Sequence, residues 1–131
     1  MRHSLAGRRS PATLAACDLT AIVVFVTIGL LHHRHGLSVA GYARDTLPLA
    51  GGWFAAGALF NAFDDGGLGA LAATWACGIP AGVLVRALVL GRPIDGSEAA
   101  FLGVCLATIG LLVLVLRGGA GLLARGAGLR A

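Results

Sequence analysis

The sequence predicts an all-α, polytopic integral membrane protein with four transmembrane helices in an up-down bundle. Hydrophobic residues make up 57% of the 131 residues and charged residues only 12%, with a mean hydropathy of +0.86. A soluble domain carries about 25% charged residues. The chain has no lysine, no glutamine and one asparagine, so it lacks the residues of a water-exposed surface. Composition therefore excludes an ordinary soluble enzyme, a disordered chain and a nucleic-acid-binding domain.

Four stretches are long and apolar enough to cross a bilayer, which needs about 20 residues at a rise of 1.5 Å each. They cover residues 12–31, 46–63, 68–85 and 99–116, and the third is expected to continue to residue 90. Backbone groups in lipid must be bonded internally, so runs of this length predict helices rather than the alternating strands of a barrel. Residues 12–116 then form the transmembrane domain, flanked by basic segments at residues 1–11 and 117–131.

The arginines predict the orientation. Four spans place both ends of the chain and the turn at residues 64–67 on one side of the membrane. That side has six arginines, whereas the opposite side has three, with Arg86 just inside the bilayer. Basic residues concentrate on the cytoplasmic side, so we expect a plasma-membrane protein with both termini in the cytoplasm. The net charge of +4 also attracts anionic lipid and does not indicate a nucleic-acid partner.

Asp18 is the one acidic residue well inside a predicted span. A charged side chain there is costly unless it faces the bundle interior or water. Counting residues along the helices places Thr74 at the same depth, so we expect an inward cluster of Asp18 and Thr74, with Thr108 or Asn61 as further members. The alternative is that Asp18 only caps a helix that begins later, at Leu19.

Arg86 is expected near the outer surface, at the end of the third span. Its long side chain can extend outward to reach Asp45, Asp95 or Glu98. Counting at 1.5 Å per residue places it about 18 Å above Asp18, so no ion pair between these two residues is expected. A role in binding an anion or a substrate is the alternative function of Arg86.

His32, His33 and His35 gather at the end of the first predicted helix. Neutral imidazoles bind transition metals, but no cysteine or carboxylate stands nearby in the sequence to complete a ligand set. The favoured interpretation is that the histidines cap the carbonyl end of the helix and anchor it at the interface. The three cysteines are isolated in three different spans. We therefore expect neither a metal nor a cofactor.

Glycines at helical spacing predict where helices pack closely. Gly78 and Gly82 in the third span form a GxxxG pattern, and Gly103 continues a small-residue pattern in the fourth span. Gly29 lies on the same face of the first span as Asp18. Small residues let helix backbones approach, and van der Waals packing drives helix association in lipid.

Several different short motifs are distributed along most of the chain, from Asp18 to Arg117. They are Asp18, Phe25-Val26, Gly29 and His35-Gly36, then Pro48 and Gly52-Trp53, then Gly82-x-Leu-x-Arg86-Ala87, and finally Asp95-Gly96 and Arg117. This set resembles domain-of-unknown-function family 3054, which comprises small four-helix membrane proteins of bacteria and archaea. The resemblance implies the fold and the membrane location. That family has no established activity, so the resemblance implies no chemistry.

No catalytic constellation can be placed in the sequence, neither a Ser–His–Asp set nor paired carboxylates nor a phosphate-binding loop. The sequence therefore favours a non-enzymatic membrane assembly protein or accessory subunit, which binds another membrane protein or further copies of itself. The alternative is a small permease or channel-like protein that moves an ion, a proton or a small solute past Asp18 and Arg86. A metal or redox enzyme that uses the histidines is the least favoured hypothesis.

Overall fold

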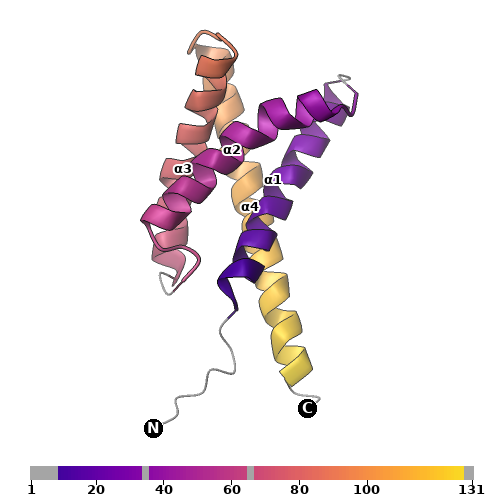
Figure 1. Ribbon diagram of the computed structural model, residues 1–131, viewed down its shortest axis with the longest axis vertical. Helices are drawn as coiled ribbons and strands as arrows, with labels where there is room; N and C mark the ends of the chain where they lie inside the picture. The colour runs from indigo at the N-terminus through magenta and orange to yellow at the C-terminus, as the bar shows by residue number, and fades with distance from the viewer. Residues whose placement is uncertain (1–8, 34–35, 65–66, 129–131) are drawn as a thin grey trace.

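The computed structural model describes residues 9–33, 36–64 and 67–128, and it contains four helices and no strand in these ranges. The helices are α1 (Pro11–His32), α2 (Val39–Leu59), α3 (Gly67–Val89) and α4 (Gly96–Gly128). The predicted all-α class is therefore confirmed (Figure 1).

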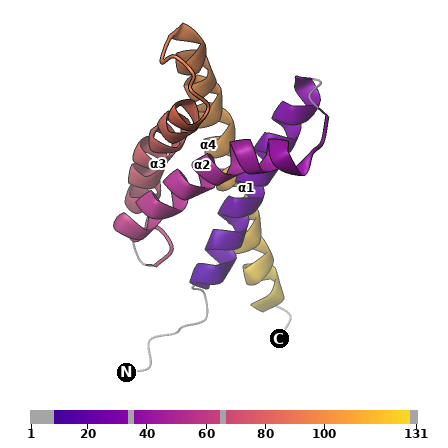
Figure 2. The ribbon, with the colours of Figure 1, turned by 45° about the horizontal axis from the view of Figure 1, so that its top comes forward.

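Each helix contacts two others, and the contacts form a ring: α1 with α2, α2 with α3, α3 with α4, and α4 with α1. Figures 1 and 2 show that the start of α1 and the end of α4 lie at the same end of the molecule, here called the lower end. The ends of α1 and α3 and the start of α4 lie at the upper end. α2 runs obliquely from the upper end toward the lower end and packs most extensively on α3.

Three helices, α1, α3 and α4, are long and apolar enough to cross a membrane. The remaining helix, α2, is not long and apolar enough to cross a membrane, so the prediction of a span at residues 46–63 is corrected. α2 begins seven residues earlier, at Val39, includes Arg44 and Asp45, and ends at Leu59. Its part after Asp45 has about 14 residues and is about 21 Å long, which is less than the ~30 Å of a hydrocarbon core.

The end of α2 is a Schellman motif, which the hydropathy of the sequence does not reveal. Asn61 has a φ of 56°, and the N–H of Ala62 donates to the carbonyl of Gly57 at 2.9 Å. A left-handed residue followed by this bond stops a helix. Asn61 is therefore an exposed turn residue and not a member of a cluster around Asp18.

Capping residues explain where α1 and α4 begin. Ser10 accepts a hydrogen bond from the N–H of Thr13, directly before Pro11 at the first helical position. Because α1 begins at Pro11, Asp18 is not the cap of a helix that starts at Leu19. Asp95 caps α4 by accepting from the N–H and the hydroxyl of Ser97. These bonds hold the pKa of the Asp95 carboxyl below its ordinary value.

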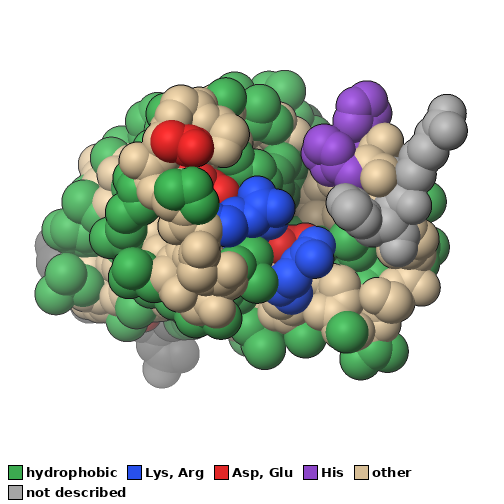
Figure 3. All heavy atoms as spheres, turned by 90° about the horizontal axis from the view of Figure 1, so that it is seen from above, with side chains coloured by type: hydrophobic (Ala, Val, Ile, Leu, Met, Phe, Trp, Pro, Cys, Tyr) green, Lys and Arg blue, Asp and Glu red, His purple; other side chains and the backbone are tan. Residues whose placement is uncertain are grey.

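Apolar side chains cover most of the outer surface of the helices, as the view from the upper end shows (Figure 3). They include large residues on all four helices, for example Ile28, Leu47, Leu84 and Leu111, each more than 45% exposed. Such a surface is not stable in water and matches a lipid environment.

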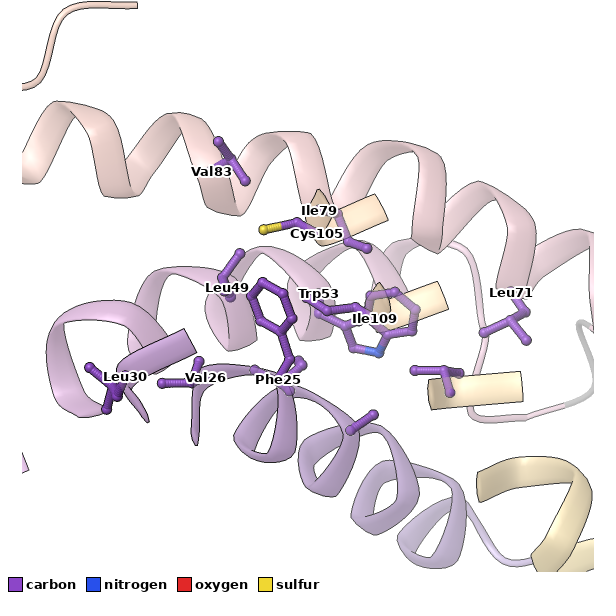
Figure 4. Packing of buried hydrophobic residues seen from close by; sticks show 13 residues of the cluster. Phe25, Val26, Leu30, Leu49, Trp53, Leu71, Ile79, Val83, Cys105 and Ile109 are labelled. Atoms are coloured by element: carbon purple, nitrogen blue, oxygen red, sulfur yellow. The ribbon is translucent and has the colours of Figure 1, made fainter. Parts of the chain in front are cut away.

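The core lies between the four helices, and every helix contributes to it (Figure 4). Trp53 of α2 is its largest fully buried side chain. Around it pack residues from all four helices, among them Phe25, Leu49, Ile79 and Ile109. This layer of apolar side chains fills the middle of the bundle.

Glycines fix the closest approach of two helices in the structure, between α2 and α3. A Cβ added to Gly52 would lie 2.5 Å from the carbonyl oxygen of Gly78 and 2.6 Å from the nitrogen of Gly82. The predicted close approach is thus found at Gly78 and Gly82. At Gly29 and Gly103 the structure differs from the expectation, because an added Cβ would meet no described atom within 4 Å.

We expect Gly52→Ala to lower the free energy of unfolding by about 1–3 kcal/mol, the usual cost of overpacking, because backbone atoms of α3 cannot move aside as side chains can. Gly51→Ala is the matched control, since an added Cβ there meets nothing within 4 Å. Unfolding of the purified protein in detergent, followed by circular dichroism, measures both. Equal stability of the two variants would contradict the close packing of α2 on α3.

Candidate functional site

Two clusters of polar side chains, each with charged residues, lie at opposite ends of the bundle. The lower cluster consists of Asp18, Trp53 and Arg117. The upper cluster consists of three arginines and two carboxylates: Arg44, Asp45, Arg86, Arg92 and Glu98.

In the lower cluster, the carboxylate of Asp18 is completely buried and accepts three hydrogen bonds. Arg117 donates from Nε to Oδ1 at 2.7 Å and from Nη2 to Oδ2 at 2.5 Å, which is a bidentate pair. The indole Nε1 of Trp53 donates to Oδ2 at 2.8 Å. These bonds offset the cost of burying the charges and connect α1, α2 and α4.

Arg117 also joins several segments at the lower end of the bundle, where it lines a cavity of about 440 Å³. Its Nη1 donates to the carbonyl of Ala62 at 3.2 Å, and its guanidinium carbon lies 5.7 Å from the centre of the Phe63 ring. The backbone carbonyl of Arg117 accepts a bond from the side chain of Arg9. Segments before α1, after α2 and within α4 therefore meet at this one residue.

The inward position of Asp18 follows the sequence analysis, but its partners are different. Thr74 is buried, and its hydroxyl donates to the carbonyl of Ala70 in its own helix at 2.8 Å. Thr108 lines a cavity toward the upper end. Sequence analysis missed Arg117 because it placed this residue outside the last span, whereas α4 continues through it to Gly128.

In the upper cluster, Arg86 joins two carboxylates. Its Nε donates to Oδ1 of Asp45 at 2.8 Å, and its Nη1 lies 3.7 Å from Oε1 of Glu98. Its guanidinium carbon lies 4.4 Å from the centre of the Phe101 ring, a cation–π distance. Two of the three partners named from the sequence are found, whereas Asp95 caps α4 instead. The side chain is only 7% exposed, so it does not reach outward into solvent.

Arg44 and Arg92 extend the upper cluster toward solvent. Nη2 of Arg44 lies 3.0 Å from Oδ2 of Asp45, and Nη1 of Arg92 lies 3.3 Å from Oε1 of Glu98. Their side chains are 40% and 54% exposed. Figure 3 shows these charges gathered in the middle of the upper face, between the helices.

A cavity of about 560 Å³ lies beside the upper cluster. Three arginines and Asp45 form part of its wall, and apolar side chains of α1 and α4 form most of the rest, including Phe25, Val26, Phe101 and Val104. Gly29 also faces this cavity, which explains why no helix backbone approaches it.

The histidines lie at the rim of this cavity. His32 and His33 both line it, and their ring centres are 5.4 Å apart in an edge-to-face arrangement. The backbone N–H of His33 donates to the carbonyl of Gly29 at the end of α1. His35 lies outside the described residues. Among residues 9–33, 36–64 and 67–128, no three His, Cys, Asp or Glu side chains are close enough to hold a metal ion.

An apolar layer separates the two clusters. Buried side chains of all four helices form it, including Phe25, Ile79 and Ile109. Cys105 is fully buried in the same layer, whereas Cys77 is exposed on α3 and Cys17 is half-buried. In the described part of the chain, the charged groups of the upper cluster therefore have no hydrogen-bonded connection to Asp18.

We expect Asp18→Asn to lower the free energy of unfolding by about 3–5 kcal/mol, because it leaves the buried guanidinium of Arg117 without its counter-charge. The double variant Asp18→Asn/Arg117→Met should recover most of this loss. Asp64→Asn, at an exposed carboxylate near the same end, is the control. Unfolding in mixed micelles by denaturing detergent measures all three variants and the single variant Arg117→Met, and additive effects of the two substitutions would contradict a direct pair.

Comparison with known proteins agrees with the resemblance noted in the sequence. No curated protein matches the chain, and no solved structure matches it. Residues 15–120, which include both ionic clusters, match the family described as "Protein of unknown function (DUF3054)". The chain therefore belongs to family DUF3054.

Proposed function

We propose that this protein is a non-enzymatic, multi-pass membrane protein that carries a small solute across the bilayer. One observation supports the proposal most. The cavity lies at the upper end of the bundle, and the apolar layer and the bonds of Asp18 with Arg117 separate it from a second cavity of about 440 Å³ at the lower end, which Arg117 lines. A cavity that is closed toward one side is typical of a carrier in one of its two alternating states.

The lower cluster is suited to act as the gate of such a carrier. Arg117 holds together α1, α4 and the segment that follows α2, through Asp18 and the carbonyl of Ala62. A buried ion pair is strong in a dry site but has a competing state in which water solvates both charges. Breaking this one pair would therefore free three segments at the lower end at the same time.

The ionised groups support binding rather than catalysis. Arg86 and Arg117 both bond to carboxylates and lie against aromatic rings. These contacts hold each guanidinium in place. Groups in such contacts recognise the charge of a ligand, whereas a catalytic acid or base must exchange protons near neutral pH.

We further propose a plasma-membrane location with the lower end in the cytoplasm. This orientation rests on the arginine count of the full sequence, which has six arginines on the side of the two chain ends and the turn at residues 64–67 and three on the opposite side, with Arg86 just inside the bilayer. α2 then completes the crossing as a short, oblique helix whose start, at Arg44 and Asp45, lies in the outer interface. The cavity faces the outside in this orientation.

We expect cysteine labelling to verify the orientation. In a variant without the three native thiols, Leu37→Cys should react with a membrane-impermeant maleimide added to intact cells, whereas Leu122→Cys should react only after lysis. Both positions are exposed, at 58% and 69%, and are on opposite ends of the bundle. The reverse labelling pattern would overturn the proposed orientation.

We expect transport to depend on the open volume of the cavity. Purified protein in liposomes should take up at least one of four radiolabelled solutes, namely octanesulfonate, alanine, glycerol or rubidium ion, faster than empty liposomes do. Val104→Trp should abolish this uptake, because the indole fills the cavity that Val104 lines. Val115→Trp, on the same helix and similarly exposed at 59%, is the matched control. Uptake equal to that of empty liposomes for all four solutes would contradict the carrier proposal.

A second candidate function is the membrane assembly protein or accessory subunit that the sequence favours. Its support is Gly103 on α4, which is exposed and whose added Cβ would meet no described atom. A small residue facing outward leaves room for a helix of another membrane protein or of a second copy. Crosslinking of native membranes followed by mass spectrometry tests this function, and recovery of the chain without any crosslinked partner would count against it.

A further inference from the structure

The cavity at the upper end has walls that change from charged to apolar with depth. Arg44, Arg86 and Arg92 line its upper part, beside the loop that joins α3 to α4. Val104 lines it eight residues into α4, which is about 12 Å below the start of the helix. Phe25 lies at a similar depth, two turns before the end of α1.

The charges of the upper cluster do not cancel. Three arginines face only two carboxylates, which leaves one positive charge in excess. Asp45 lines the cavity, whereas Glu98 is not part of its wall and lies behind Arg86 and Arg92. The surface that a ligand would meet is therefore positive.

Arg86 also has unused hydrogen-bonding capacity. A guanidinium has five N–H donors, and the structure shows a single hydrogen bond from this one, from Nε to Asp45. Nη1 is buried, lies 3.7 Å from Oε1 of Glu98 and has no hydrogen-bond partner among the described residues. Buried polar groups are normally bonded to protein or to another molecule, so the guanidinium of Arg86, which lines the cavity, has N–H donors left for a further partner.

From these observations we infer that the cavity binds an amphiphilic monoanion. Its oxygen-bearing anionic head accepts hydrogen bonds from Arg86 and Arg92, and its apolar chain lies against Phe25, Phe101 and Val104. One negative charge matches the single excess positive charge, and the volume of about 560 Å³ is in the range of small-molecule sites. This inference deepens the proposed function, since it names the class of solute, but binding is testable without transport.

Binding of octanesulfonate, which keeps one negative charge at all working pH values, tests the inference. The full chain in nanodiscs of phosphatidylcholine is titrated by calorimetry with octanesulfonate, octanol and octyltrimethylammonium. We expect saturable binding of octanesulfonate and at least about tenfold weaker binding of the neutral and cationic analogues, as the loss of one charge-assisted contact implies. Equal affinity for all three would overturn the inference.

Two variants and two matched controls separate the cavity from general partition into lipid. Arg92→Gln, at a half-exposed side chain that pairs with Glu98, should weaken octanesulfonate binding, and Val104→Trp should abolish it. Arg125→Gln and Val115→Trp are the matched controls and should leave the affinity unchanged. If Arg92→Gln and Val104→Trp bind as the unaltered chain does, the site is not this cavity and the inference fails.

Two sources of the anion are distinguished by adding phosphatidylglycerol to the nanodiscs. Competition with octanesulfonate identifies an anionic lipid headgroup as the occupant, and no competition identifies a free amphiphilic acid. Either result supports an anion site. If octanesulfonate binds but no solute is taken up into liposomes, the anion site is supported and the carrier proposal is refuted. If alanine, glycerol or rubidium ion is taken up but octanesulfonate does not bind, only the anion site is refuted.

Discussion

The bond between Asp18 and Arg117 is the constraint on which the rest of the bundle depends. It places two opposite charges in a site where Asp18 has no exposed surface, and it aligns α1 with α4 along the lower half of the molecule. Trp53 completes the hydrogen bonding of the carboxylate and thereby fixes the rotation of α2. Glycine contacts then bring α3 against α2. The position of each helix follows from these few contacts, and lipid-facing side chains need only be apolar.

The two ends of the molecule use charge differently. At the lower end one carboxylate accepts three hydrogen bonds from two residues of other helices and has no exposed surface. At the upper end Arg86 keeps unbonded donors next to a cavity, and Arg44 and Arg92 are partly exposed. A low local dielectric strengthens the electrostatic interactions at both ends. An ion pair whose hydrogen bonds are all made favours a rigid structure, whereas one that keeps unbonded donors favours ligand binding.

The fold was largely predictable because hydropathy reports directly on burial in lipid. Three spans and the inward face of Asp18 follow from it. The bounds of α2 do not follow from hydropathy. Its end depends on the left-handed conformation of Asn61. Its first turns include Arg44, which is stabilised by an ion pair that hydropathy does not reveal. Arg117 was missed as the partner of Asp18 because the last span was expected to end before it. Two residues far apart in the sequence can be matched by their depth in the membrane only if the end of each helix is known, and α4 continues past Arg117.

The sequence separation of the lower pair has a consequence for biosynthesis. Asp18 and Arg117 are 99 residues apart. During insertion, α1 enters the membrane with a buried carboxylate whose counter-charge is still being translated, and such a group is costly in lipid. α1 must therefore stay near the translocon or be held by another protein until α4 arrives. A chain that stops before α4 lacks Arg117 and therefore retains an acid without its counter-charge.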